Sequence, residues 1–278
     1  MTNNSPGTKT PRELIKQVLP PELWDRARQS WYALYRALLW PSATFHPWRR
    51  RSIRRLKGLK DIHRGRRGFI IGNGPSLNRM DLRPLRDEIT FGMNRIYLMF
   101  PELGFYTSYF LSINSLVIEQ CAEDIRSLPI PKFLSWRSHK VIKPTEDMIF
   151  LHTTYTGPRF AEDACTRLWE GATVTYVAMQ LAFHLGLDPV ILIGVDHSYA
   201  SQGKPNTTIV SQGDDASHFN VDYFGMGFRW QLPDLETSEK AYRMALAAYQ
   251  RAGRRIIDAT VDGKLNIFPK ADFSSLFN

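Results

Sequence analysis

The 278-residue sequence contains few cysteines and no long apolar run. Cys121 and Cys165, its only cysteines, have neither metal-ligand spacing nor the pattern of a disulfide framework, so we expect reduced thiols in a cytosolic protein. The first ten residues are polar, and no later stretch is apolar enough to span a bilayer. We therefore expect neither a signal peptide nor a membrane span. The composition, 43% hydrophobic and 23% charged, is that of an ordinary globular protein.

Acidic residues are scarce in the first quarter of the chain. Residues 1–67 hold sixteen Lys and Arg against four acids, a net charge of +12, whereas the remainder holds twenty against 23, a net charge of −3. The sequence thus predicts a basic helical appendage at residues 1–67 and a nearly neutral catalytic body at residues 68–278.

Tryptophan and arginine are concentrated in this appendage. Four of the seven tryptophans precede residue 49, and the apolar spacing after Pro21 predicts a helix that ends at Pro41. Tryptophan beside clustered arginine is typical of helices that lie on anionic membranes, so residues 21–60 are a candidate membrane surface. The alternative is a helix docked on the body with a solvated basic rim. Nucleic acid is the least favoured partner, because the excess charge is confined to the appendage.

One stretch, residues 68–77, organises the body. The apolar residues Phe69 to Ile71 predict a buried strand, and the loop Gly72–Ser76 follows it. The glycines allow a close backbone approach to a ligand, and Pro75 suits the first position of a helix. A strand, a glycine loop and a helix N-terminus together predict a phosphate site, although an ordinary turn has the same pattern.

Strands and helices then alternate along the chain. Strands are predicted near residues 89–94, 105–113, 132–136, 189–194 and 254–260, with helices at 173–185 and from Thr237 to Arg251. This alternation predicts an α/β fold with a doubly wound, mostly parallel, Rossmann-like sheet. Residues 137–170 show no clear period and are expected to form a lid or insertion, and residues 200–217 are expected to form a loop.

Ligands of such sheets bind outside the carboxyl ends of the strands. Asparagines in these places can bind ribose, base or phosphate without repelling an anion. Asn94 stands where a dinucleotide-binding fold needs an acidic residue, which argues against a nicotinamide dehydrogenase. The predicted nucleotide-binding residues are Gly72, Asn73, Gly74, Pro75, Ser76, Asn94, Asn114, Thr173, Gly194 and Asp196.

His218 is the predicted general base, because histidine titrates near neutral pH and can accept a proton from an attacking hydroxyl. The alternative is a loop histidine that only makes hydrogen bonds. Asp196 is expected to orient His197 or His218, to hold a cation, or to bind backbone N–H groups. Asp214, Asp215 and Asp222 lie too close in sequence to assign, and no residue set has zinc-site spacing, so no metal ligands are predicted.

Several of these residues carry a family resemblance. Residues 71–77 with Asn94, residues 182–196 and Ser217-His218-Phe219 resemble the bacterial sialyltransferases of glycosyltransferase family forty-two. Residues 68–278 look closer to the MptE-like family, named after an archaeal 6-hydroxymethylpterin diphosphokinase, and are similar to the core of the Maf flagellin glycosyltransferases. Residues 194–199, 218–225 and 263–269 carry this closer resemblance.

The sialyltransferase resemblance implies that Asn73, Asn94 and Asn114 contact a CMP-sugar and that His218 deprotonates the acceptor. The tyrosine that assists the leaving phosphate in that family falls near Ile191, which leaves Tyr199 or His197 to replace it. An expected arginine is missing near Gly171.

The leading interpretation is a nucleotide-dependent glycosyltransferase that uses a CMP-activated sugar and needs no cofactor. Its acceptor would be a cell-envelope polysaccharide or a lipid-linked molecule, and the enzyme would be cytoplasmic or peripheral at the inner membrane face. One alternative is a diphosphokinase that uses ATP and Mg²⁺, with Asp196 and Asp214 or Asp215 near the metal; no Walker lysine supports it. Another is a non-catalytic nucleotide-binding protein of a polysaccharide pathway.

Overall fold

The structure is a computed structural model that describes residues 20–155, 157–198 and 203–277. It divides into two units, Met1–Phe45 and His46–Asn278. The first unit contains helix α2 (Pro21–Phe45), which continues past Pro41. The prediction that Pro41 ends this helix is wrong. The proline removes one N–H donor, but the carbonyl four residues earlier belongs to the exposed Ala37, where water can satisfy it.

The second unit contains the other helices and strands of the described chain. Its α-helices are α3 (Pro47–Leu59), α4 (Phe100–Leu103), α5 (Ser115–Gln120), α6 (Ala122–Ser127), α7 (Val174–His184) and α8 (Leu235–Arg251). Its strands are β1 (Gly68–Ile71), β2 (Ile89–Met93), β3 (Tyr109–Ser112), β4 (Lys132–Ser135), β5 (Met148–Thr154), β6 (Arg167–Trp169), β7 (Val190–Ile193), β8 (Thr208–Val210), β9 (Arg229–Gln231) and β10 (Ile256–Asp258). Short 3₁₀ helices are η1 (Pro75–Arg79), η2 (Arg83–Asp87), η3 (Ile96–Met99), η4 (Trp136–Ser138) and η5 (Ser274–Phe277).

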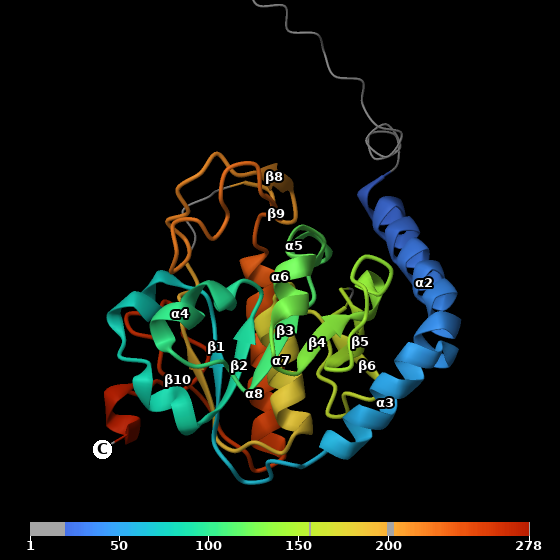
Figure 1. Ribbon diagram of the computed structural model, residues 1–278. Helices are drawn as coiled ribbons and strands as arrows, with labels where there is room; N and C mark the ends of the chain where they lie inside the picture. Colours follow the sequence, from blue (N-terminus) through green and yellow to red (C-terminus); the bar gives the residue numbers. More distant parts are fainter. Residues whose placement is uncertain (1–19, 156, 199–202, 278) are drawn as a thin grey trace, which may run out of the picture. The chain divides into compact units, whose positions relative to one another are not determined.

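Eight strands form one parallel sheet in the order β10-β7-β1-β2-β3-β4-β5-β6. The chain adds strands in one direction from β1 to β6, then returns through α7 to place β7 on the other side of β1. Helices α5 and α6 lie on one face of the sheet, and α7 and α8 lie on the other (Figure 1). The body is therefore α/β with a doubly wound sheet, as predicted. Its switch point lies between β1 and β7.

The sheet forms the core because its strands are apolar and covered on both faces. All four residues of β1 and of β7 are buried, and ten of the eleven residues of α7 are buried as well. Thr173 caps α7, and Gly186 at φ +85° follows its end. Helix α8 begins earlier than the predicted Thr237 cap, because the Asp234 carboxylate accepts a hydrogen bond from the Thr237 amide at 3.0 Å.

Residues 137–170 do not form an irregular lid, since they supply strands β5 and β6 at the edge of the sheet. The polar run His152-Thr153-Thr154 conceals β5 in the sequence. All seven β5 residues are buried. Helix α3 packs on this strand, and the Phe150 amide donates to the Ser52 hydroxyl at 2.9 Å.

Helix α3 consequently belongs to the second unit, which begins at His46 rather than at the predicted residue 68. This packing is hard to predict from the arginine-rich sequence, because the buried face of α3 is narrow and mostly polar. It consists of Arg49, Ser52 and Leu56. The loop expected at residues 200–217 also contains β8, which pairs antiparallel with β9. No helix in the described part of the chain is long and apolar enough to cross a membrane.

Candidate active site

The loops that follow β1 and β7 are tied together at the switch point. The Gly74 amide donates to the Gly194 carbonyl at 2.9 Å, and the Ser76 amide and hydroxyl donate to the Asp196 carboxylate at 3.1 and 2.7 Å. A Cβ atom on Gly72 would lie 2.1 Å from the Gly194 carbonyl oxygen, and one on Gly74 would lie 1.7 Å from Asp196 Oδ2. The two glycines are therefore required by the approach of the β7 loop.

In this geometry the Asp196 carboxylate is an anion supplied by the protein itself, and it binds the glycine loop. The helix expected from Pro75 is a five-residue 3₁₀ turn, and the Ser76 N–H at its start is bound to Asp196. Asp196 thus binds a backbone N–H, one of the three roles expected of it, and its carboxylate also accepts from the Ser76 hydroxyl. Pro75 and Ser76 have structural roles in the loop. The loop side chain that could still bind a ligand is that of Asn73.

The amide oxygen of Asn73 is buried and has no hydrogen-bond partner among the described residues. Its backbone carbonyl accepts from the Phe219 amide at 2.9 Å, and Asn78 Nδ2 donates to the Phe219 carbonyl at 2.7 Å. These two bonds hold the segment next to His218 against the glycine loop. A buried acceptor without a donor is rare in folded proteins and indicates a place for water or a ligand group.

His218 forms a close pair with Asp215. Its Nδ1 lies 2.7 Å from Asp215 Oδ2, and the side chains are only 11% and 8% exposed. Because an ionised carboxylate can only accept, Nδ1 carries the proton and Nε2 carries the lone pair. The imidazole also stacks on Tyr223, with ring centroids 3.9 Å apart and an interplanar angle of 5°. Carboxylate and tyrosine together fix the orientation of a ring that can accept a proton at Nε2.

Arg95 joins the His218 loop to the end of β2. Its guanidinium donates to the Asp222 carbonyl at 2.9 Å and to the Tyr223 carbonyl, and it lies over the Phe228 ring at 5.2 Å. The neighbouring Asn94 has φ +52°, and its amide oxygen accepts from the Ser112 hydroxyl at 3.0 Å. The ends of β1 and β2 and the His218 loop therefore meet at one edge of the sheet.

Asn114 and Thr173 act as helix caps. The Asn114 amide oxygen accepts from the Leu116 amide at 2.9 Å at the start of α5, and the Thr173 hydroxyl accepts from the Thr175 amide at 3.3 Å at the start of α7. Local capping therefore explains both residues without a ligand. Their proposed contact with a nucleotide remains a prediction.

His197 lies on the β7 side of the switch point, at φ +56°. Its Nε2 lies 3.1 Å from Glu239 Oε1 on α8, and hydrogen bonding from His197 lowers the pKa of the Glu239 carboxyl. His197 thus forms a second imidazole–carboxylate pair next to Asp196. Tyr199, the other residue predicted to assist the leaving group, lies outside the described residues.

Sequence reasoning missed the residues that orient the site. Spacing alone does not separate Asp215 from the nearby Asp214 and Asp222, although its position three residues before His218 is compatible with the pair that the structure shows. Arg95 directly follows the predicted Asn94, but its carbonyl partners in residues 222 and 223 lie more than a hundred residues away. No local sequence pattern predicts such a contact.

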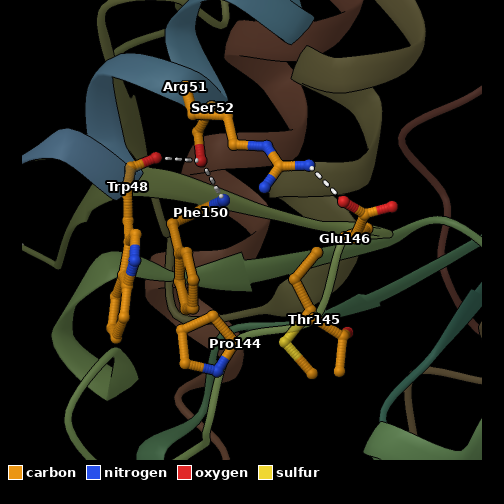
Figure 2. A pocket seen from close by; sticks show the side chains of 8 residues that line it. Trp48, Arg51, Ser52, Pro144, Thr145, Glu146 and Phe150 are labelled. Carbon is orange, nitrogen blue, oxygen red and sulfur yellow. Dashed lines mark hydrogen bonds and ion pairs between the residues drawn. The ribbon is translucent and has the colours of Figure 1, made fainter.

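Two hollows accompany the described surface. One, of about 240 Å³, adjoins the His218 loop and is lined by Asn78, Leu98, Met99, Glu102, Phe219 and Asn220. The other, of about 220 Å³, lies between α3 and the beginning of β5, where Trp48 and Phe150 flank it (Figure 2). Since β5 begins at Met148, this second hollow lies at the opposite edge of the sheet from the strand ends that carry the candidate site.

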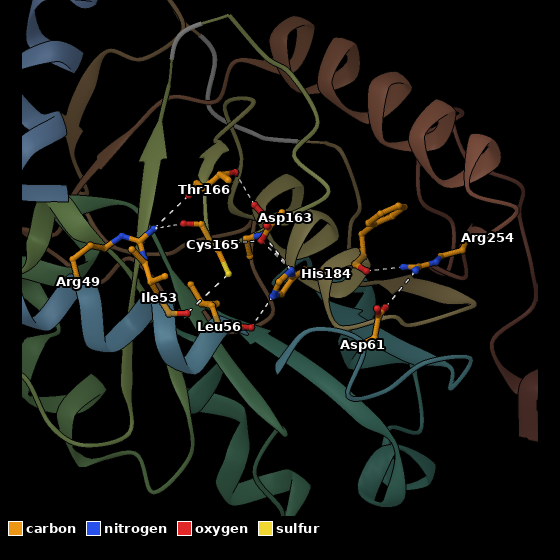
Figure 3. A network of polar contacts seen from close by, with 11 residues as sticks. Arg49, Ile53, Leu56, Asp61, Asp163, Cys165, Thr166, His184 and Arg254 are labelled. Carbon is orange, nitrogen blue, oxygen red and sulfur yellow. Dashed lines mark hydrogen bonds and ion pairs between the residues drawn. The ribbon is translucent and has the colours of Figure 1, made fainter. Parts of the chain in front are cut away.

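Asp163, Cys165 and His184 form a group with metal-ligand chemistry (Figure 3). Both ring nitrogens of the buried His184 already have partners: Nε2 lies 2.9 Å from the Leu56 carbonyl oxygen, and Nδ1 accepts from the Ala164 amide at 3.3 Å. Burial and the Asp163 carboxylate raise the pKa of Cys165 to about 11, which keeps the thiol protonated at neutral pH. We interpret the group as a set of structural contacts that connect α3, α7 and the turn before β6.

A family model described as 6-hydroxymethylpterin diphosphokinase MptE-like matches residues 48–202, which is more than half of the chain. The chain belongs to the MptE-like family. The match extends from α3 to the loop after β7, so it includes the glycine loop, Asn94 and Asp196. It begins earlier than the resemblance expected from residue 68, and it ends before the Asp215–His218 loop.

Two solved structures match this chain, a Maf glycosyltransferase and a sialyltransferase. A Maf glycosyltransferase from Magnetospirillum magneticum AMB-1 is 14% identical with a TM-score of 0.45, over 81% of this chain and 38% of that one. A mammalian sialyltransferase crystallised with Gal-beta-1-3GalNAc-ortho-nitrophenol is 13% identical with a TM-score of 0.37, over 84% of this chain and 86% of that one. This chain thus spans well under two thirds of the Maf protein. No curated protein sequence matches significantly.

Proposed function

We propose that this protein is a nucleotide-dependent transferase, and specifically a glycosyltransferase that moves a sugar from a CMP-activated donor to a hydroxyl of a cell-envelope polysaccharide or lipid-linked acceptor. The observation that carries the proposal is the pair Asp215–His218, with Nδ1 of the imidazole 2.7 Å from the carboxylate and the pair bound through Phe219 to the glycine loop. A base so oriented beside a strand-end loop is suited to activating an acceptor hydroxyl.

The proposed reaction is a single displacement. His218 Nε2 takes the proton of the acceptor hydroxyl, and the oxygen of that hydroxyl bonds to the anomeric carbon of the donor sugar. The bond from that carbon to the phosphate oxygen breaks, and CMP leaves with the electron pair. Asp215 stabilises the imidazolium that forms. The anomeric configuration is inverted, since one displacement occurs.

The environment of Asn73 supports a nucleotide at this place. Its buried amide oxygen lacks a donor, and a ribose hydroxyl or the exocyclic amine of cytosine would supply one. Asn94 and Arg95 supply further polar groups at the neighbouring strand end. His197, backed by Glu239 at 3.1 Å, is the described side chain proposed to assist the departing phosphate. The donor phosphate would meet these side chains, because the Ser76 N–H is taken by Asp196.

Nucleotide binding is the first test. We would measure thermal unfolding with CMP, CTP, UDP, GDP and ATP, each with and without Mg²⁺. A ligand at 100 times its dissociation constant stabilises the fold by about 2.7 kcal/mol, which shifts the transition visibly. Stabilisation by cytidine nucleotides without metal supports the proposal. Absence of any cytidine effect would contradict it.

Turnover is the second test. We would incubate the protein with CMP-sialic acid or another CMP-sugar and detect released CMP in the presence of candidate hydroxyl acceptors. His218→Ala should reduce turnover about 10²–10⁴-fold, the usual contribution of a general base, while the CMP-induced thermal shift stays near that of the wild type. Unchanged turnover in this variant would remove His218 as the base. Cytidine binding without turnover of any donor would instead favour a non-catalytic nucleotide-binding protein.

The family description favours one second candidate, a diphosphokinase that transfers pyrophosphate from ATP with Mg²⁺. Its expected metal ligands are Asp196 and Asp214 or Asp215. In the structure Asp196 binds Ser76 and Asp215 binds His218, so both carboxylates already have partners. Stabilisation by ATP only when Mg²⁺ is present would favour this candidate over the glycosyltransferase.

A further inference from the structure

Helix α2 carries an apolar stripe that faces solvent. Its members recur at intervals of three, four or seven residues and therefore share one side of the helix. They are Leu23, Ala27, Trp31, Leu34, Leu38 and Phe45. The exposed fractions are 66% for Trp31, 53% for Leu34 and 70% for Leu38. An exposed apolar stripe of this kind normally marks a surface that binds another molecule or a membrane.

Helix α3 carries an exposed basic face. Arg50, Arg54 and Lys57 lie four and three residues apart, and all three are exposed. No ion-pair partner for any of them is found among the described residues, whereas Arg51 pairs with Glu146 at 3.5 Å and Arg55 donates to the Met148 carbonyl at 3.0 Å. The buried side of the same helix packs on β5, so this basic face is held by the body.

The charge of the whole stretch selects the partner. Residues 26–60 contain ten Lys and Arg and not one Asp or Glu. A second copy of this chain would bring one such positive stretch against another, without the acidic residues that pair helices in coiled coils. An anionic lipid surface complements both features, because it accepts apolar side chains between its headgroups and attracts the arginines around them.

We propose that residues 21–60 bind an anionic lipid bilayer, with the α2 stripe Leu23–Phe45 inserted at the headgroup level and the α3 face Arg50–Arg54–Lys57 against the phosphates. Its residues are not among those of the proposed nucleotide site, and its function does not depend on the identity of the donor sugar. It would concentrate the protein where membrane-embedded acceptors lie.

The test is cosedimentation of the full chain with vesicles of phosphatidylcholine alone or mixed with phosphatidylglycerol. We expect binding only to the mixed vesicles, and weaker binding at high salt. Leu34→Gln/Leu38→Gln should reduce the partition coefficient at least about 30-fold, because two exposed leucines no longer enter the apolar layer. Ala37→Gln, which changes an exposed position beside the stripe, is the matched control and should bind normally.

The electrostatic part has its own variant pair. Arg50→Gln/Arg54→Gln should reduce binding roughly 30-fold, since each basic residue near an anionic surface contributes about a factor of five. Lys240→Gln/Arg251→Gln removes the same charge from exposed positions of α8 and should change binding little. Thermal unfolding of each variant verifies that the body is intact.

Several results would overturn the proposal. One is equal binding to neutral vesicles, and another is unchanged binding of Leu34→Gln/Leu38→Gln or of Arg50→Gln/Arg54→Gln. A third is a lipid-free dimer that Leu34→Gln/Leu38→Gln dissociates in sedimentation velocity, which would assign the stripe to a second copy. Tighter binding to single-stranded RNA than to the mixed vesicles would do the same. His218→Ala should bind vesicles like the wild type, so failure of the catalytic proposal and failure of this one are separate outcomes.

Discussion

The replacement Asp215→Asn tests the central pair of the site most directly. The side chain keeps its size, but the negative charge next to Nδ1 is lost. A hydrogen bond to a charged group contributes about 1.5–3 kcal/mol, and this bond is short and nearly buried. Losing that contribution when the imidazolium forms should slow transfer roughly 10- to 150-fold. The loss approaches 10⁴-fold if the new NH₂ group faces Nδ1, because the ring then carries its proton on Nε2 and cannot accept one.

The assay is CMP release from the donor that the binding series identifies, measured at saturating donor and acceptor. The matched control is Asp214→Asn, an exposed neighbour at φ +48°, a conformation that asparagine adopts readily. It should turn over like the wild type. The Asp215→Asn protein should keep its nucleotide-induced thermal shift, since the carboxylate faces the imidazole. If Asp215→Asn and Asp214→Asn retain equal, wild-type turnover, the orienting role of Asp215 is refuted.

Two further predictions concern stability. Gly74→Ala should lower the free energy of unfolding by several kcal/mol in urea titrations, because the new Cβ would lie 1.7 Å from Asp196 Oδ2. The control Gly58→Ala, in α3 with no atom within 4 Å of the new Cβ, should raise the free energy of unfolding by about 0.5–1 kcal/mol. A decrease below about 1 kcal/mol in Gly74→Ala would contradict the requirement for glycine at this position. Burial, with the charges of nearby arginines, lowers the pKa of His152 to about 4 from 6.5. The unfolded chain therefore binds the extra proton first, and stability should fall by about 3 kcal/mol as pH drops from 6.5 to 4. His152→Gln should lose this part of the pH dependence, and an identical pH slope in both proteins would contradict the assignment.

Much of the fold could be predicted because its strands are short apolar runs that end in glycine or asparagine. The β1 run Phe69 to Ile71 and the β7 run ending at Gly194 are of this type, and their parallel arrangement follows from the helix between successive strands. Strand β5 could not be found in the same way. Its second half is polar, and its burial depends on cover from α3, about a hundred residues earlier.

The candidate site, like the fold, is only partly predictable from the sequence. Residues that follow strands, such as Asn73, Asn94 and Asp196, can be predicted from position alone. What each one contacts cannot, because the partner is remote in sequence: Ser76 is 120 residues from Asp196, and Arg95 is 128 residues from Tyr223. The sequence therefore predicts which strand ends carry polar groups, whereas the structure is needed to show that Asp196 binds the Ser76 N–H expected to bind a phosphate.

The tie between Ser76 and Asp196 also has a consequence for the order of folding. During synthesis, strands β1 to β6 emerge before β7, and they can pair with one another without it. The glycine loop then lacks the Gly194 carbonyl and the Asp196 carboxylate that hold it, because both arrive 120 residues later. Closing so long a loop is slow compared with local pairing. We therefore expect the nascent chain to build most of its sheet first, and the glycine loop to acquire its final shape only when β7 enters beside β1.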